Sequence, residues 1–146
     1  MMRLTILSIS GRPGLYKLVS KGKASLIVES IDERHRRTPA FTTDRVISLA
    51  DITVYAASDD IPLMKIMAGI REKEGGKPVA LNYRKCPKEE LRGYFAQVQP
   101  DFDRERVHDS DMRRILSWYD ILVNNGITNF EEIMKPTDGD NIADRE

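Results

Sequence analysis

The chain of 146 residues is 40% hydrophobic and 32% charged, which indicates a soluble globular protein of one domain or of two small ones sharing a core. Its 23 basic and 23 acidic residues give a formal net charge of zero, which argues against nonspecific nucleic-acid binding over the whole surface. The single cysteine, Cys86, excludes an intrachain disulfide, and no apolar run approaches the roughly 18 residues of a membrane span. We therefore expect a cytoplasmic protein with no membrane partner.

Apolar residues alternate along the first part of the chain, from about Leu15 to Ala56, which is typical of β-strands. The predicted strands cover residues 4–9, 16–20, 24–30, 38–41, 46–49 and 52–56. The turn Lys21-Gly22-Lys23 makes the second and third the clearest hairpin, and Pro39 places the fourth at a sheet edge because proline cannot donate to a ladder. So many short strands predict a small SH3-like barrel or an open meander capped by helices.

From about Leu63 to Met134 the apolar residues recur at helical spacing. Helices are predicted over about 63–74, 87–99, 110–124 and 128–135. Asp59 and Asp60 are expected to cap the first helix, and Gly75-Gly76 to end it and form a hinge. The third helix is expected to be capped by Asp109 or Ser110.

The change of period predicts an α+β protein with a β-barrel-like domain at 1–58, a helical domain at 59–137 and a disordered acidic tail at 138–146. A β unit of under 60 residues is marginal alone, so we expect it to share a core with the helices. Trp118 lies beside the apolar stripe of the third helix and is expected to be buried packing.

No strong catalytic, cofactor or zinc-binding motif is present in the sequence. His35 and His108 have acidic neighbours, and Cys86 follows a lysine just before a helix start, but structural or incidental roles are the favoured reading of all three. We therefore expect neither an enzyme nor a bound cofactor or metal.

Two basic groups are the candidate binding surface. The first is the run Arg34-His35-Arg36-Arg37, whose guanidinium groups could grip phosphate from a hairpin tip. The second is a group of basic residues of which Lys88 and Arg92 are spaced to share one helix face. Its members are Lys77, Arg84, Lys85, Lys88 and Arg92, and the last three are counted in the candidate surface. The favoured interpretation of the first group is a solvated loop balanced by Asp32 and Glu33, and the second is read against a solvated helix face offset by Glu89 and Glu90.

The stretch Ile9-Ser10-Gly11-Arg12-Pro13-Gly14-Leu15-Tyr16-Lys17-Leu18, followed by Leu26-Ile27-Val28-Glu29-Ser30, resembles a bacterial family of unknown function. Ile115-Leu116-Ser117-Trp118-Tyr119 and Asn125-Gly126-Ile127-Thr128 resemble the second part of that family. The resemblance covers most of residues 1 to about 132 and implies a short β domain followed by a helical domain. It implies no activity and no site residues.

The sequence thus favours a non-enzymatic binding or adaptor protein with an unidentified protein partner. The alternative is a nucleic-acid-binding protein that uses the basic hairpin and the basic helix face. An enzyme of unfamiliar type, using His35, His108 or Cys86, is the weakest hypothesis.

Overall fold

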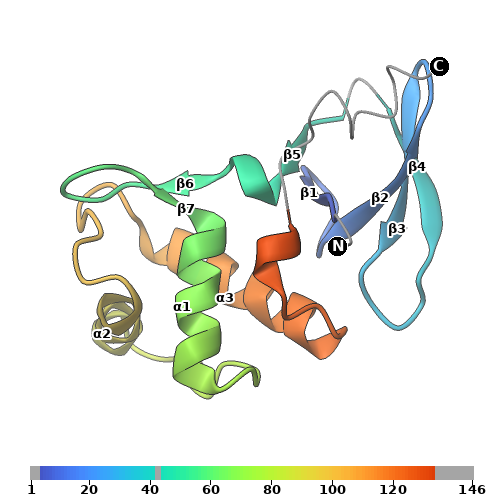
Figure 1. Ribbon diagram of the computed structural model, residues 1–146. Coiled ribbons are helices and arrows are strands. Elements are labelled where there is room, and N and C mark those ends of the chain that lie inside the picture. The colour runs from blue at the N-terminus through green and yellow to red at the C-terminus, as the bar shows by residue number, and fades with distance from the viewer. Residues whose placement is uncertain (1–3, 42–43, 134–146) are drawn as a thin grey trace. The chain divides into compact units, whose positions relative to one another are not determined.

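Figure 1 shows the computed structural model, which describes residues 4–41 and 44–133. The described residues form two compact units, one containing 4–41, 44–52 and 131–133 and the other containing 53–130. We refer to them as the sheet unit and the helical unit. The tail predicted at 138–146 lies outside the described residues.

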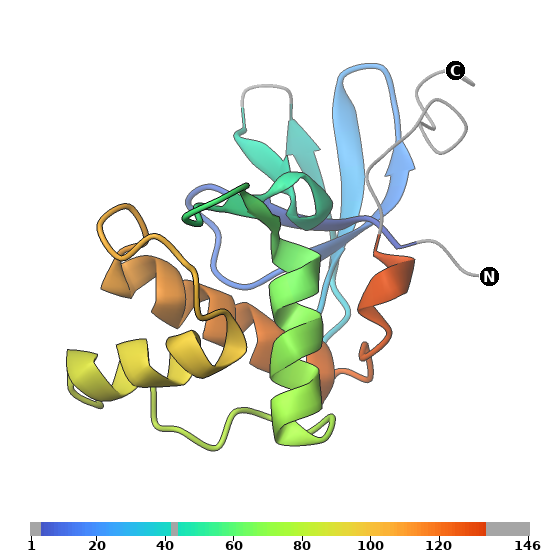
Figure 2. The same ribbon diagram turned by 60° about the vertical axis from the view of Figure 1, so that its left-hand side comes forward.

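The sheet unit is built on a five-stranded antiparallel sheet with the order β4-β3-β2-β1-β5. The strands are β1 (Ile6–Ile9), β2 (Tyr16–Lys21), β3 (Ser25–Ser30), β4 (Arg37–Phe41) and β5 (Val46–Ser48). The first four form a meander, and β5 pairs with the other side of β1 (Figures 1 and 2). The predicted hairpin of β2 and β3 is confirmed, and β4, which contains Pro39, is an edge strand as predicted.

The sheet is open, so the predicted SH3-like barrel is not confirmed. The outer edge of β4 supplies the physical reason. Pro39 has no N–H, and its carbonyl oxygen accepts a hydrogen bond from Arg12 Nη2 at 3.0 Å. The N–H of Phe41 donates to Asp44 Oδ2 at 2.8 Å, and its carbonyl oxygen accepts from the Asp44 N–H at 2.9 Å. These contacts occupy the outward backbone groups of Pro39 and Phe41, with which β4 would pair another strand.

One face of the sheet carries an apolar cluster drawn from all five strands. Its fully buried members are Leu7, Ile9, Val28 and Ala40, and its partly buried members are Tyr16, Leu18, Leu26 and Val46. The register places them together, because alternate residues of a strand share a face and paired residues point the same way.

The sixth predicted strand, at 52–56, does not join this sheet. A short 3₁₀ helix, η1 (Leu49–Asp51), interrupts the extended chain after β5. β6 (Thr53–Val54) then pairs with β7 (Ile61–Pro62) as a separate two-stranded ladder in the helical unit. The alternating pattern correctly predicted an extended segment here, but it does not determine which strand that segment pairs with.

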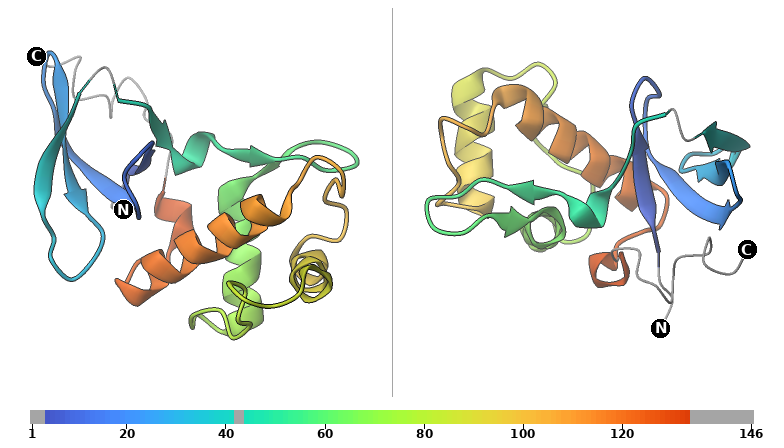
Figure 3. Two further views of the ribbon diagram at one scale, coloured as in Figure 1. Left: turned by 180° about the vertical axis from the view of Figure 1, so that it is seen from behind. Right: turned by 90° about the horizontal axis from the view of Figure 1, so that it is seen from above.

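The helical unit contains α1 (Leu63–Glu74), α2 (Lys88–Val98) and α3 (Asp109–Asn124), each of which contacts the other two (Figure 3). Their buried residues match the predicted apolar stripes: Leu63, Ile66, Met67 and Ile70; Leu91, Tyr94 and Phe95; and Met112, Ile115, Leu116, Tyr119 and Leu122. The predicted last helix is a single 3₁₀ turn, η2 (Phe130–Glu132), and residues 134–137 lie outside the described residues.

The structure corrects two predicted helix caps. Asp59 and Asp60 do not cap α1, whose N-cap is Pro62 and carries no side-chain hydrogen bond. The N-cap of α3 is His108, whose backbone N–H donates to Asp111 Oδ2 at 3.0 Å, the reach-back bond of a capping box.

The carboxylate of Asp120 on α3 holds the irregular segment 75–87 that joins α1 to α2. Its Oδ1 accepts the Val79 N–H at 2.8 Å, and its Oδ2 accepts the Tyr83 hydroxyl at 2.6 Å. Arg113, also on α3, donates from Nε to the Tyr83 carbonyl oxygen at 2.9 Å. Gly75 ends α1 with a φ of 64° as predicted, but the segment after this expected hinge is pinned by hydrogen bonds.

Tyr119, rather than Trp118, is the buried aromatic residue of α3. The Tyr119 side chain is fully buried, its ring centroid lies 5.8 Å from that of Phe130, and its hydroxyl donates to the Lys77 carbonyl oxygen at 2.8 Å. Trp118 remains partly exposed. Trp118→Ala should therefore lower the free energy of unfolding by less than the roughly 3–5 kcal/mol expected for a fully buried Trp.

We predict that Asp120→Ala lowers the free energy of unfolding by about 2 kcal/mol, because it leaves the Val79 N–H and the Tyr83 hydroxyl without their acceptor. Chemical denaturation measures the change. Glu72→Ala removes an exposed carboxylate from α1 and should be nearly neutral. Equal stabilities for the two variants would contradict the assigned role of Asp120.

We also predict a loss of stability in alkali. Burial raises the pKa of Tyr83 and of Tyr119 to about 12. In the unfolded chain a tyrosine ionises near pH 10, so from about pH 10 to about 12 the unfolded state releases these protons first. The free energy of unfolding should therefore fall over that window, and the fall should be smaller in Tyr83→Phe. Denaturation at several alkaline pH values tests this, and parallel profiles for the two proteins would refute it.

Candidate functional site

Asp32 organises the predicted basic hairpin, which is the loop between β3 and β4. Its Oδ1 accepts the Ser30 hydroxyl at 2.9 Å and the backbone N–H groups of Arg34 and His35 at 2.8 and 3.0 Å. These hydrogen bonds, chiefly that from Ser30, lower the pKa of Asp32. His35 takes a left-handed conformation with a φ of 46°, which completes the tight turn.

Glu29 of β3 offsets part of the positive charge of this loop. Its carboxylate lies 3.1 Å from Arg37 Nε, 3.6 Å from His35 Nδ1 and 3.9 Å from Lys17 Nζ. The hydrogen bond from Arg37 lowers the pKa of Glu29, so the carboxylate stays charged. Arg34 and Arg36 extend from the loop as exposed residues.

The residues of the second basic group have different roles in the structure. Lys85 and Lys88 are exposed, but Arg92 ties α2 to the segment that leads into α3. Its guanidinium donates to Asp109 Oδ1 at 2.7 Å, to the Arg104 carbonyl oxygen at 3.1 Å and to the Val107 carbonyl oxygen at 3.2 Å. Arg92 therefore stabilises a chain connection instead of adding a cation to an open helix face.

The weak catalytic candidates occupy ordinary structural positions. His35 is exposed beside Glu29, and His108 is exposed at the N-cap of α3. Cys86 is partly exposed, and its carbonyl oxygen accepts a hydrogen bond from Arg113. Within residues 4–41 and 44–133, no three histidine, cysteine or acidic side chains are grouped so that they could hold a metal ion.

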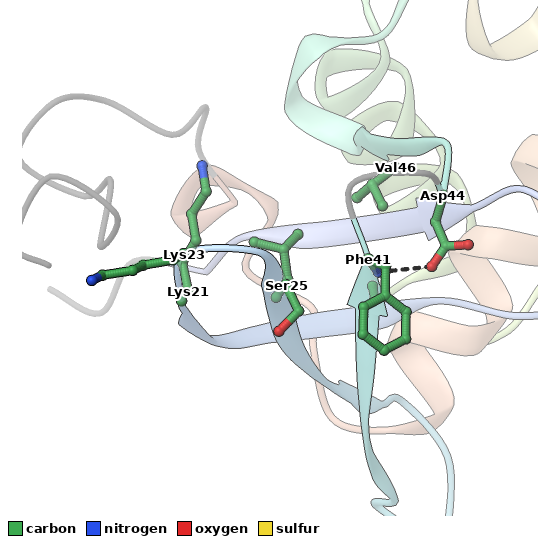
Figure 4. A pocket seen from close by; sticks show the side chains of 9 residues that line it. Lys21, Lys23, Ser25, Phe41, Asp44 and Val46 are labelled. Atoms are coloured by element: carbon green, nitrogen blue, oxygen red, sulfur yellow. Dashed lines mark hydrogen bonds between the residues drawn. The ribbon is translucent and has the colours of Figure 1, made fainter.

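The sheet unit contains a pocket of about 220 Å³ that sequence reasoning did not predict (Figure 4). It is lined by Lys21, Gly22, Lys23, Ser25, Leu26, Ala40, Phe41, Asp44 and Val46. Leu26, Ala40 and Val46 belong to the apolar cluster of the sheet and give the pocket an apolar lining. Figure 4 shows the two lysines at one end, with their ammonium groups extending outward, and Phe41 with Asp44 at the other end.

Phe41, which lines this pocket, is 52% exposed. Its backbone is fixed by both hydrogen bonds to Asp44, and Arg12 Nη2 lies 3.4 Å from Asp44 Oδ2. Strand alternation could have indicated that Phe41 points away from the apolar cluster. It could not have shown that Val46 of β5 and Leu26 of β3 line the same pocket, because that depends on the path of the chain after β4.

Comparison with known proteins places the chain in a family. Residues 4–49 match "Domain of unknown function (DUF5606)", and residues 52–122 match "Domain of unknown function (DUF6852)". The chain therefore belongs to a bacterial family of unknown function with a short N-terminal β domain and a helical C-terminal domain, as the resemblance predicted.

A solved structure agrees with this assignment. The solution NMR structure of a structural genomics target from Bacteroides vulgatus is 51% identical, covers 89% of this chain and 91% of its own, and has a TM-score of 0.72. No curated protein matches the chain. In the described part of the chain, no helix has the length and apolar character needed to cross a membrane.

We predict that Arg92→Ala lowers the free energy of unfolding by about 1–2 kcal/mol, because three hydrogen bonds of a partly exposed guanidinium are lost. Lys88→Ala, which removes an exposed cation from the same helix, should be close to neutral. Denaturant unfolding of both variants tests whether Arg92 has a structural role that Lys88 lacks. A neutral Arg92→Ala would return Arg92 to the candidate binding surface.

Proposed function

We propose that this is a cytoplasmic, non-enzymatic binding protein that contacts a protein partner through the pocket side of its sheet unit. The observation that carries the proposal is Phe41, half exposed beside a pocket with an apolar lining. Interfaces are enriched in aromatic residues, and burying such residues supplies much of the binding energy. Covering the exposed half of one phenylalanine ring would contribute on the order of 2 kcal/mol.

The size and lining of the pocket support binding over catalysis. Sites for small molecules and cofactors usually enclose roughly 300–1,000 Å³, more than the volume of about 220 Å³ found here. The pocket lining includes one carboxylate, Asp44, and no histidine or cysteine. Asp44 already accepts the Phe41 N–H and faces the Arg12 guanidinium, so its role is to fix the end of β4.

The charge balance of the basic hairpin supports a protein partner over nucleic acid. Four cations, Lys17, Arg34, Arg36 and Arg37, stand in or beside this loop, together with three acids, Glu29, Asp32 and Glu33. Nucleic-acid surfaces depend on unbalanced positive charge that neutralises several phosphates. The small excess of one positive charge favours at most weak phosphate binding.

We predict that Phe41→Ser reduces co-purification of the partner at least about tenfold, because it removes the exposed ring. Ile47→Ser is the matched control, since Ile47 is also 52% exposed on the same sheet but does not line the pocket. Each tagged full-length protein is expressed at native level, cross-linked in the source cells and quantified by mass spectrometry.

The purification is repeated after nuclease treatment. A protein lost in Phe41→Ser, retained in Ile47→Ser and indifferent to nuclease supports the proposal. Capture that disappears with nuclease, and with joint replacement of Arg34, Arg36 and Arg37 by serine, would establish the nucleic-acid alternative instead. Equal capture by all variants would refute both.

A further inference from the structure

We infer that the helical unit has a binding site of its own, which takes a segment of a protein partner that carries lysine or arginine. The site is formed by residues 55–60 and 101–106, which we call the acidic platform. The inference goes beyond the proposed function, because it does not depend on the pocket of the sheet unit. It follows from the exposed ring of Tyr55 and from the charges around that ring.

Backbone hydrogen bonds hold the two segments of the acidic platform side by side. The first segment is the loop between β6 and β7 (Figure 1), and the second lies between α2 and α3. The Asp103 N–H donates to the Tyr55 carbonyl oxygen at 2.9 Å, and the Ala57 N–H donates to the Asp101 carbonyl oxygen at 2.8 Å. These bonds flank an antiparallel bridge between the segments. The backbone of Tyr55 is therefore already fixed before a partner binds, which lowers the entropic cost of binding.

The ring of Tyr55 supplies apolar contact area and attracts cations. Tyr55 is 45% exposed, and the guanidinium carbon of Arg106 lies 4.2 Å from its ring centroid. Lysine and arginine have aliphatic stems that pack on aromatic rings, while their charged ends reach acidic groups nearby. The exposed part of the Tyr55 ring can therefore receive such a side chain from a partner.

The acidic platform has more acids than bases. Its two arginines are Arg104 and Arg106, and its five acids are Asp59, Asp60, Asp101, Asp103 and Glu105. In the described part of the chain, no hydrogen bond or ion pair engages the exposed carboxylates of Asp59 and Glu105. A cationic side chain is therefore complementary to this surface.

The two arginines of the acidic platform are already engaged within it. Arg106 donates from Nε to Asp103 Oδ2 at 2.9 Å. This hydrogen bond and the nearby charge of Asp60 raise the pKa of Arg106, so two carboxylates offset the cation beside Tyr55. Arg104 donates from Nη1 to two backbone carbonyl oxygens at 3.0 and 3.1 Å. The arginines therefore do not cancel the attraction of the surface for an incoming cation.

The test is an NMR titration of the ¹⁵N-labelled full-length protein with two short peptides. The first alternates arginine with glycine, and the second has glutamine in place of each arginine. We expect shifts of the amides in residues 55–60 and 101–106. The arginine peptide should bind at least about tenfold more tightly than the glutamine peptide, because glutamine removes the charge complementarity.

Variants at exposed acids localise the binding. Asp59→Asn combined with Asp60→Asn should weaken binding of the arginine peptide about fivefold or more, because two carboxylates of the acidic platform are lost. The matched control is Glu33→Gln combined with Asp51→Asn, which makes the same charge change at exposed positions of the sheet unit and should leave the affinity unchanged. All four side chains are exposed, so neither variant threatens the fold.

Variants at Tyr55 test the role of its ring. Tyr55→Leu keeps an apolar side chain but removes the aromatic face, so it should weaken binding of the arginine peptide about threefold. Tyr55→Phe keeps the face and should bind the peptide as the parent protein does.

Several results would overturn the inference. These are equal affinity for the two peptides, amide shifts confined to residues outside the acidic platform, equal weakening in the sheet-unit control, or no binding of the arginine peptide. The proposed function rests on Phe41 and its capture experiment, so it would stand or fall separately from this result.

Discussion

The contact of Arg12 with the outer edge of β4 is the constraint on which the sheet unit depends. The guanidinium reaches Pro39 and Asp44 from the loop after β1, and Asp44 in turn engages both backbone groups of Phe41. An edge strand with unsatisfied groups would invite pairing with β5 or with another chain. At Pro39 and Phe41 those groups are already satisfied, the sheet is open, and a pocket lies between residues of its two edge strands, Ala40 of β4 and Val46 of β5.

The helical unit satisfies its irregular backbone by the same physical means. Asp120 accepts hydrogen bonds from Val79 and Tyr83, and Arg92 donates to the carbonyl groups before α3. In both units, a charged side chain serves backbone groups that no helix or ladder can reach. Each unit also leaves one large aromatic side chain exposed: Phe41 is 52% exposed in the sheet unit, and Tyr55 is 45% exposed in the helical unit.

The sequence predicted the elements better than their closure or the site. The stripes of α1 and α3 and the hairpin around Gly22 were predicted correctly, because they depend on local period and turn chemistry. The sequence left open whether the sheet would close into a barrel or stay an open meander, since the edge of β4 depends on Arg12 meeting Pro39 and Asp44, which are 27 and 32 residues away. The pocket was missed for the same reason: its lining comes from separate parts of the chain that only the folded sheet brings together.

The contacts of the basic residues show what a run of charges in the sequence leaves open. Sequence shows a cation but not its partner, and Arg37 and Arg92 each meet a carboxylate within 3.1 Å. Such a cation gains little by moving to an external phosphate, because it must first give up a charge-assisted hydrogen bond. An exposed aromatic ring faces no comparable exchange, since covering it only removes apolar area from water. For the binding function proposed above, Phe41, with its backbone fixed and its ring half uncovered, is therefore a stronger candidate than Arg37 or Arg92.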